Sequence, residues 1–113
     1  MKDFLLAFRM DYTHMPEPST EQAQAMMKSW MDWMGGIAAQ GKLASQGNRL
    51  ENSGKVVKAN NVVTNGPFTE IKESLGGYSI VKADSYEAAI EIAKGCPILN
   101  VGGNVEVREV GKM

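Results

Sequence analysis

The sequence predicts a small α+β domain of the ferredoxin-like type, an antiparallel sheet with both helices on one face. Two segments have the apolar spacing of amphipathic helices, and four β-compatible segments surround them. Their order is strand, helix, strand, strand, helix, strand, which is the order of a ferredoxin-like domain. The chain has 113 residues, 43% of them hydrophobic, which suits one core. We therefore treat residues 1–113 as a single domain.

The first strand is expected over residues 4–10. Side chains alternate between the two faces of a strand. Two sets result: Phe4, Leu6 and Phe8 on one face, and Leu5, Ala7 and Arg9 on the other.

A long helix is expected from Ser19 to Gly41. Ser19 and Gln22 have the spacing of a capping box, and Gly41 is typical of a helix end. One buried stripe is predicted: Ala23, Met26, Met27, Trp30, Met34, Ile37 and Ala38. Each glycine of Gly35-Gly36 costs roughly 1 kcal/mol relative to alanine inside a helix, so we expect close backbone packing there. Trp33 lies off the stripe and is expected to reach a dimer contact.

The middle of the chain is expected to be β structure. Residues 43–50 predict a polar second strand. Residues 55–58 and 61–64 are β-branched runs that flank Ala59-Asn60, which indicates a hairpin. Residues 78–83 supply the third main strand.

A second helix and a last strand complete the prediction. Asp84 is expected to cap the helix, with Glu87 at the capping-box position, and Gly95 and Pro97 end it. The predicted buried stripe is Tyr86, Ala89, Ile90 and Ala93. Residues 104–110 form the last strand.

The sheet face away from the helices is expected to be mixed in character. It is predicted to carry Leu5, Ala7, Leu43, Ser79 and Val81 beside Arg9, Ser45 and Arg49. Water is a poor cover for such a face, whereas a two-fold dimer packed sheet against sheet would bury it and could enclose a cavity. We therefore expect a homodimer.

Composition argues against several function classes. A net charge of −1 and a pI near 5.8 provide no cationic field for direct contact with nucleic acid. The N-terminus has no signal-peptide pattern, and no apolar run is long enough to span a bilayer, so we expect a cytoplasmic protein without membrane contact. Cys96 and His14 are the only cysteine and histidine, which argues against disulfides and zinc clusters. We expect neither a metal nor a cofactor.

The most specific feature of the sequence is the run from Asn65 to Tyr78, NGPFTEIKESLGGY. It combines a tight turn, alternating charges and a glycine pair. It resembles the DGPF…E.KE…GGY signature of the YCII-related family, and the segments KDFLLAF, EAAIEIAKGCP and VEVREV extend the resemblance over nearly the whole chain. The resemblance implies a dimeric α+β barrel. Asn65 stands where the family has Asp, which keeps the turn but removes a carboxylate.

Charged and polar residues provide candidates for a binding or catalytic site. The candidate ligand-binding residues are Arg9, Arg49, Arg108, Glu70, Lys72 and Tyr78, and the candidate catalytic residues are His14, Asp11 and Glu106. Guanidinium groups in a half-dry cavity would bind a carboxylate or enolate through paired donors. Glu106, or a histidine oriented by Asp11, would then move a proton.

A purely structural role for these residues is the competing interpretation. Glu106 and Arg108 would form cross-strand ion pairs with Arg9 that set the register, and the charges of residues 70–73 would hold their own loop closed. His14 would be an exposed histidine without a special role. The two-residue period does not decide which sheet face carries Glu106 and Arg108.

Two functions of different classes remain at this point. The first is a dimeric protein that binds a small anionic ligand, or a metal-independent acid/base enzyme for a carboxylate- or carbonyl-bearing compound. The second is a non-catalytic accessory or regulatory module with a transcription-factor partner. The family resemblance implies this second function, because similar domains occur alongside or fused to sigma-factor-like proteins. The sequence leaves open whether the protein is an enzyme.

Overall fold

The computed structural model describes residues 1–12, 17–66 and 73–112. The helices and strands follow in the order β1 (Lys2–Met10), α1 (Thr20–Ala39), β2 (Leu43–Arg49), β3 (Gly54–Val57), β4 (Val63–Gly66), β5 (Ser74–Ala83), α2 (Tyr86–Ala93) and β6 (Asn104–Glu109). Two short 3-10 helices are η1 (Ala59–Asn61) and η3 (Pro97–Val101).

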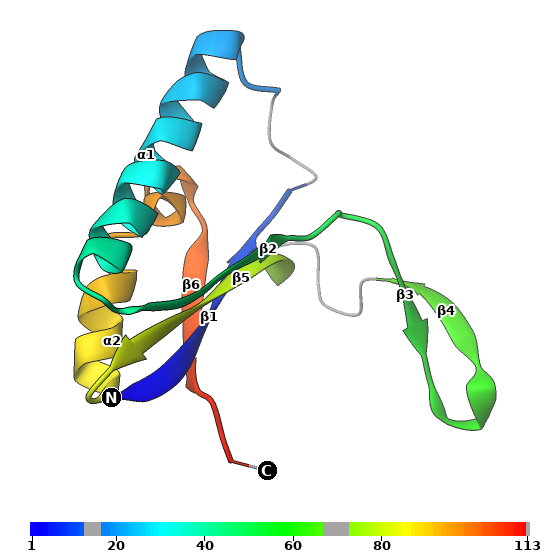
Figure 1. Cartoon of the computed structure of the whole chain (residues 1–113). Coiled ribbons are helices and arrows are strands. Elements are labelled where there is room, and N and C mark those ends of the chain that lie inside the picture. The colour runs from blue at the N-terminus through cyan, green and yellow to red at the C-terminus, as the bar shows by residue number, and fades with distance from the viewer. Residues whose placement is uncertain (13–16, 67–72, 113) are drawn as a thin grey trace.

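The main sheet confirms the predicted α+β, ferredoxin-like topology. It has four strands in the order β2-β5-β1-β6, and all of its neighbours are antiparallel. Within the described residues, α1 and α2 both lie on one side of it (Figure 1). Among the described strands, β3 and β4 pair with each other and not with the main sheet, and so form a separate hairpin.

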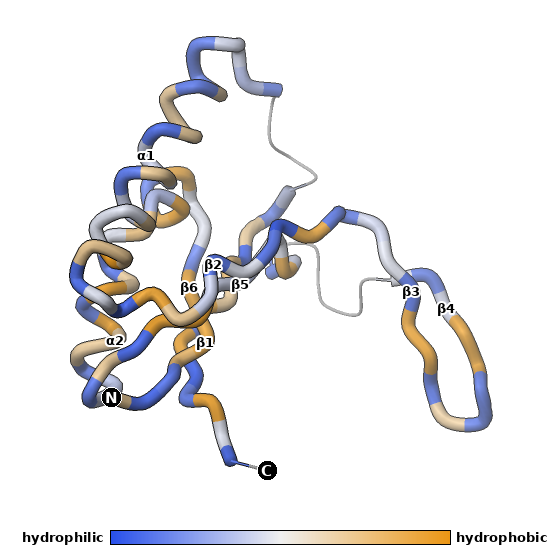
Figure 2. Tube along the Cα trace, in the orientation of Figure 1, coloured by the Kyte–Doolittle hydropathy of each residue, from blue (hydrophilic) through white to orange (hydrophobic). Residues whose placement is uncertain are grey.

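The core lies between the sheet and the helices. The alternation predicted for β1 is confirmed, because Phe4, Leu6 and Phe8 are all buried on the helix-covered face. The buried cluster consists of Phe4, Leu6, Phe8, Met10, Ile37, Val81, Ala83, Ala89, Ala93, Cys96 and Ile98. Figure 2 shows hydrophobic colouring along the inner strands of the sheet.

The capping box predicted for α1 is confirmed. The backbone N–H of Gln22 donates to Ser19 Oγ at 3.1 Å, and the N–H of Ser19 donates to Gln22 Oε1 at 2.9 Å. These two bonds satisfy amide donors that have no partner inside the first turn of a helix.

The predicted stripe of α1 is only partly right. Ile37 is buried and Trp30 and Met34 are half-buried, but Met27 remains 65% exposed and Ala23 and Ala38 are also exposed. The first turns of α1 project past the sheet and lack an underlying layer (Figure 1).

Trp33 is half-buried and packs against residues of its own chain, and its expected role at a dimer contact stays a prediction. Its Nε1 donates to the carbonyl of Ile92 at 3.0 Å, and its ring stands edge-on to Phe8 with centroids 5.9 Å apart. The indole therefore joins α1 to the end of α2.

Two details of α2 differ from the prediction. Its N-cap is Ser85, one residue after Asp84, and Ser85 Oγ accepts the backbone N–H of Ala88 at 3.2 Å. Tyr86 is 44% exposed, with its ring edge-on to Phe4. Ile90 is also exposed, whereas Ala89 and Ala93 are buried as expected. The short helix therefore covers the sheet with Ala89 and Ala93, and Ala88 and Ile92 pack against the same core while partly buried.

The face assignment of three sheet residues is wrong. Ser79 and Val81 are fully buried beneath the helices, and Leu43, opposite Val81, packs against the same core. Alternation sorts side chains into two sets but does not say which set meets the helices. Ser79 fits there because it is small and its hydroxyl donates to the carbonyl of Gln46 at 2.8 Å.

Substitution of Gly47 tests the close packing of β2 against β5. Gly47 has φ +72°, and an added Cβ would collide with the carbonyl of Tyr78, so Gly47→Ala should destabilise the fold by about 2 kcal/mol or more.

A Cβ at Gly35 would meet no atom within 4 Å, contrary to the close packing expected from the sequence. Gly35→Ala should therefore stabilise α1 by about 1 kcal/mol. Urea unfolding measures both, and a destabilising Gly35→Ala would contradict the open helix surface.

The buried thiol of Cys96 predicts a loss of stability at high pH. Burial raises the pKa of Cys96 from 9.0 to about 11. Between these values the folded chain keeps a proton that the unfolded chain has released, so the free energy of unfolding falls as pH rises through this window. The slope should approach about 1.4 kcal/mol per pH unit. Denaturant titrations from pH 8 to 10.5 measure it.

The control for this prediction is Cys96→Ala, which should have a shallower slope above pH 9. Some slope should remain, because burial and the neighbouring Cys96 also raise the pKa of Tyr12. Equal slopes in the two proteins would show that the thiol is not the group responsible.

Candidate functional site

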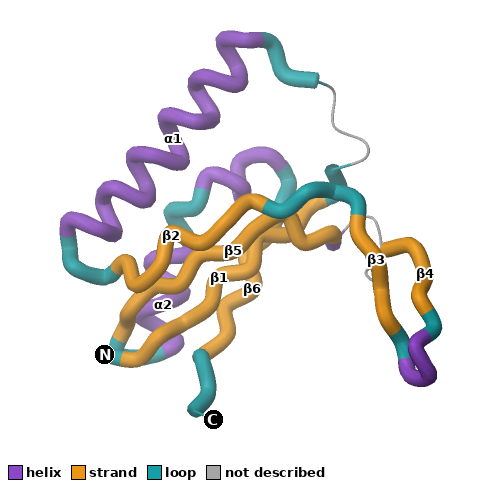
Figure 3. Tube along the Cα trace, turned by 45° about the vertical axis from the view of Figure 1, so that its right-hand side comes forward, coloured by secondary structure: helices purple, strands orange, loops and turns teal. Residues whose placement is uncertain are grey.

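The face of the sheet opposite the helices, here called the open face, has no covering layer within the described chain (Figure 3). A shallow hollow of ≈ 280 Å³ lies on it. The lining residues are Leu5, Ala7, Arg9, Leu75, Tyr78, Glu106 and Arg108. A mainly apolar floor therefore carries three charged side chains.

Strand register places two of these charges on the open face. In the pairing of β1 with β6, Ala7 lies opposite Glu106 and Leu5 lies opposite Arg108. Directly opposed residues of antiparallel strands point to the same side of a sheet. The pairing therefore places Glu106 and Arg108 on the open face, which the two-residue period could not decide.

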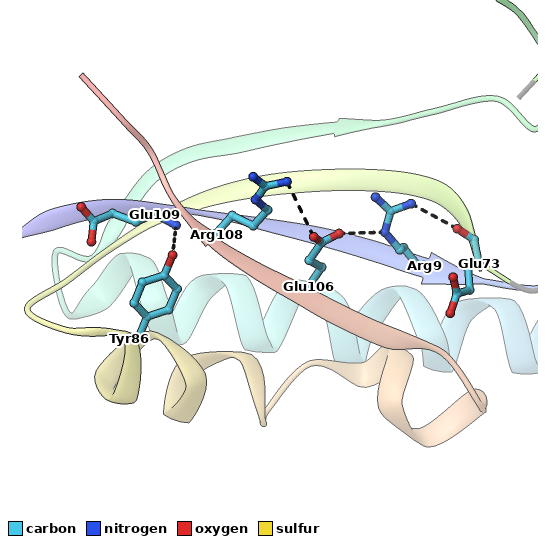
Figure 4. A network of polar contacts seen from close by, with 6 residues as sticks. All are labelled: Arg9, Glu73, Tyr86, Glu106, Arg108 and Glu109. Carbon is cyan, nitrogen blue, oxygen red and sulfur yellow. Dashed lines mark hydrogen bonds and ion pairs between the residues drawn. The ribbon is translucent and has the colours of Figure 1, made fainter. Parts of the chain in front are cut away.

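Arg9, Glu106 and Arg108 form one cluster, which we call the open-face cluster. Arg9 Nε donates to Glu106 Oε1 at 3.1 Å, and Arg108 Nη1 lies 3.9 Å from Glu106 Oε2. Arg9 Nη1 also donates to the carbonyl of Glu73 at 3.2 Å. Figure 4 shows these side chains standing on the sheet, pointing away from the helices below.

The cross-strand ion pairs expected under the structural interpretation are therefore present. Their charges do not balance, since two guanidinium groups meet one carboxylate. The side chain of Arg108 is 73% exposed, against 24% for that of Arg9, and its contact with Glu106 is longer than a hydrogen bond. The cluster thus has a net positive charge and one guanidinium group that is accessible to an anion.

Tyr78 stands beside the cluster on β5. Its Oη accepts a hydrogen bond from Asn48 Nδ2 at 3.1 Å. The phenolic hydrogen is then left to donate elsewhere, so Tyr78 presents a neutral donor at the hollow. Asn48 was not among the sequence candidates, and the register places it opposite Tyr78.

Arg49 is not part of this cluster. It lies on β2, at the opposite edge of the sheet from Arg108, and its Nη2 contacts Glu51 Oε1 at 3.1 Å in an exposed pair. Its neighbour Asn48 points to the open face, so Arg49 points to the other side. The bulge before Asn48, which includes Gly47 at φ +72°, moves the register from the regular alternation that the sequence suggested.

Three candidates lie outside the described residues: His14, Glu70 and Lys72. Asp11 follows β1 directly and is half-buried. Among the described candidates, ion pairs join Arg9, Glu106 and Arg108 in the cluster.

At the far end of β6, Tyr86 of α2 reaches over the strand. Its Oη accepts the backbone N–H of Glu109 at 2.9 Å (Figure 4). This bond ties α2 to the edge strand that carries Glu106 and Arg108, and so helps to hold the position of the cluster.

Residues 1–12, 17–66 and 73–112 contain no group of three or more His, Cys, Asp or Glu side chains placed to hold a metal ion. Neither helix in these segments has the length and apolar character needed to cross a bilayer.

Fold and site together define a class of protein, a ferredoxin-like α+β domain with an arginine-rich cluster on an uncovered sheet face. The family model of the YCII-related domain matches residues 7–113, nearly the whole chain. The chain belongs to the YCII-related family. A search of curated proteins finds no match to it.

A double-mutant cycle tests the strength of the central ion pair. Arg9→Met and Glu106→Gln each remove one partner, and the coupling free energy in the isolated chain should be below about 1 kcal/mol because the pair is partly exposed to water. Urea unfolding of the four proteins at low concentration measures it. The pair Lys28 and Asp32 on α1, 2.8 Å apart, serves as an exposed reference. A coupling of several kcal/mol would show that water is excluded from the cluster.

Proposed function

We propose that this protein is a dimeric small-molecule-binding protein whose open face holds an anionic ligand bearing a carboxylate or carbonyl group. Arg9 and Arg108 are the anchors. The observation that carries the proposal is the open-face cluster, in which two guanidinium groups share one carboxylate above an otherwise apolar floor.

The ligand chemistry follows from the donors. A guanidinium group presents parallel N–H donors that match the two oxygens of a carboxylate. The side chain of Arg108 is more exposed and less tightly held than that of Arg9. Its guanidinium group would therefore turn toward a ligand. Tyr78 supports the proposal with a neutral donor for a carbonyl oxygen at the same hollow.

In this proposal, a second copy of the chain packs on the open face and covers it. The residues opposed across β1 and β5 include Leu5 and Ile80, both on the uncovered side of the sheet. Packed sheets lie about 10 Å apart, a distance that side chains fill, and the hollow of ≈ 280 Å³ on this face would leave space for a small ligand. Excluding water would strengthen the attraction between the arginines and an anion.

Acid/base chemistry is the step beyond binding. A carboxylate- or carbonyl-bearing compound held by the arginines lies beside Glu106, the carboxylate of the cluster. In a metal-independent reaction, Glu106 would accept a proton from the carbon next to the bound carbonyl, while the arginines stabilise the enolate that forms. Binding alone requires only the arginines.

The alternative is a non-catalytic accessory module, with a transcription-related protein as its partner. Met27 and Met31 on α1, each 65% exposed, are the observation in its favour, because flexible methionines suit adaptable protein surfaces. This function would make no use of the open-face cluster.

Thermal stability in the presence of small carboxylates tests the proposal. Malonate, pyruvate and acetoacetate are suitable probes, and a ligand at one hundred times its Kd should add about 2.7 kcal/mol to the free energy of unfolding. The effect should be lost in Arg9→Gln and Arg108→Gln but kept in Arg49→Gln, a matched arginine on the other edge of the sheet.

Sedimentation velocity at micromolar concentration tests the dimer separately. The wild-type chain should be dimeric, and Leu5→Glu should weaken the dimer by placing a charge on the open face. If no carboxylate stabilises the protein and the chain is a monomer, the proposal is wrong. If affinity capture also recovers a transcription factor, and Met27→Asp abolishes the capture, the accessory module is the correct function.

A further inference from the structure

The hairpin of β3 and β4 stands apart from the rest of the domain. Its strands pair from Gly54 with Gly66 to Val57 with Val63 and share no ladder with the main sheet. The radius of gyration is 15.5 Å, against about 13 Å for a compact domain of this length. Figures 1 and 3 both show the hairpin projecting to one side of the body.

The outer surface of this hairpin is apolar. Val57 and Val63 are direct cross-strand partners and are 70% and 58% exposed, and Val62 is 51% exposed. Figure 2 shows hydrophobic colouring along β3 and β4, far from the body of the domain. A lone two-stranded hairpin is at best marginally stable in water, so these valines indicate a surface that packs against something else.

Internal bonds nevertheless give the hairpin a definite shape. The backbone N–H of Lys58 donates to the carbonyl of Val62 at 2.6 Å, and Lys55 Nζ donates to Asn65 Oδ1 across the strands. Asn60 and Asn61 turn the tip with φ of 64° and 61°, a conformation that asparagine tolerates better than most residues. The hairpin is thus a preformed arm and not an irregular loop.

The position of the arm indicates which molecule it contacts. It projects on the side of the sheet opposite the helices, the side of the open face (Figure 1). Whatever covers the open face must therefore lie next to the arm. In the dimer proposed above, that neighbour is a second copy of this chain.

The opposite charges of the hairpin and of the rest of the chain agree with contact between two copies. Residues 54–66 contain two lysines and no acidic residue, a charge of +2, whereas the whole chain carries −1, so the remainder carries −3. A cationic arm would be attracted to the anionic body of another copy. Two lysines beside three exposed valines are a poor match to the dense phosphate charge of a nucleic acid.

We propose that the β3–β4 hairpin is an arm that packs on the second copy of the chain, with Val57 and Val63 as its contact. The proposal rests on the dimer of the proposed function. Two-fold symmetry makes each copy give one arm and receive another, so that the arms flank the seam between the two open faces. The arm thereby adds apolar contact area beyond that of the two sheets.

The first test is the affinity of the dimer. The double variant Val57→Asp/Val63→Asp should raise the dimer Kd at least tenfold in sedimentation velocity, because both charges would lose water at the contact. The matched control, Met27→Asp/Met31→Asp, changes two equally exposed apolar residues on α1 and should leave the dimer Kd unchanged. Circular dichroism checks that both variants fold.

The second test does not depend on a destabilising variant. A photoreactive benzoylphenylalanine at position 57 is placed in a mixture of isotope-labelled and unlabelled chains. Cross-linked peptides of mixed isotope content, joining residue 57 to the body of another copy, would support the arm. Cross-links confined to one chain would overturn it.

The remaining outcomes separate this proposal from the proposed function. If the dimer and the carboxylate stabilisation persist while Val57→Asp/Val63→Asp leaves the dimer Kd unchanged, the arm is wrong and the proposed function stands. If the dimer depends on the arm but no carboxylate binds, the arm stands and the ligand proposal is wrong. Retardation of duplex DNA that is lost in Lys55→Ala/Lys58→Ala would make the hairpin a nucleic-acid arm and overturn the proposal.

Discussion

One constraint underlies the rest of this structure: within the described residues, a four-stranded sheet has helices on only one of its faces. On the covered face, Phe4, Leu6 and Val81 are removed from water completely. On the other face, apolar side chains and a set of charges share a surface that the described residues leave uncovered. The core therefore accounts for the stability of the domain. The open face leaves apolar and charged groups accessible, which is what binding of a ligand or of a second copy would require.

The open-face cluster illustrates how such a surface acquires chemistry. Arg9 and Glu106 are 97 residues apart in the sequence and meet because β1 and β6 are antiparallel neighbours. In water, an ion pair of this exposure contributes little to stability. If the surface is covered, the same charges interact through a lower dielectric and favour an anion more strongly. Covering the sheet and binding an anion are thus physically coupled.

Much of the fold could be predicted from the sequence because the signals are local. The capping box at Ser19 and the turn residues of the β3–β4 hairpin act within a few positions, and the structure contains both features. The face of Ser79 and the direction of Arg49 could not be predicted in this way. The first depends on which side the helices pack, and the second on a bulge at Gly47 that shifts the register of β2.

By itself, the sequence determined the order of helices and strands, the YCII-related signature and the residue types able to bind an anion. Only the tertiary structure decided that Arg9, Glu106 and Arg108 share one face and that Arg49 lies apart from them. Hydrophobic period and capping are properties of neighbouring residues, whereas the meeting of distant strands depends on register and on the side that the helices cover. A functional site built across strands is therefore visible only once the sheet has formed.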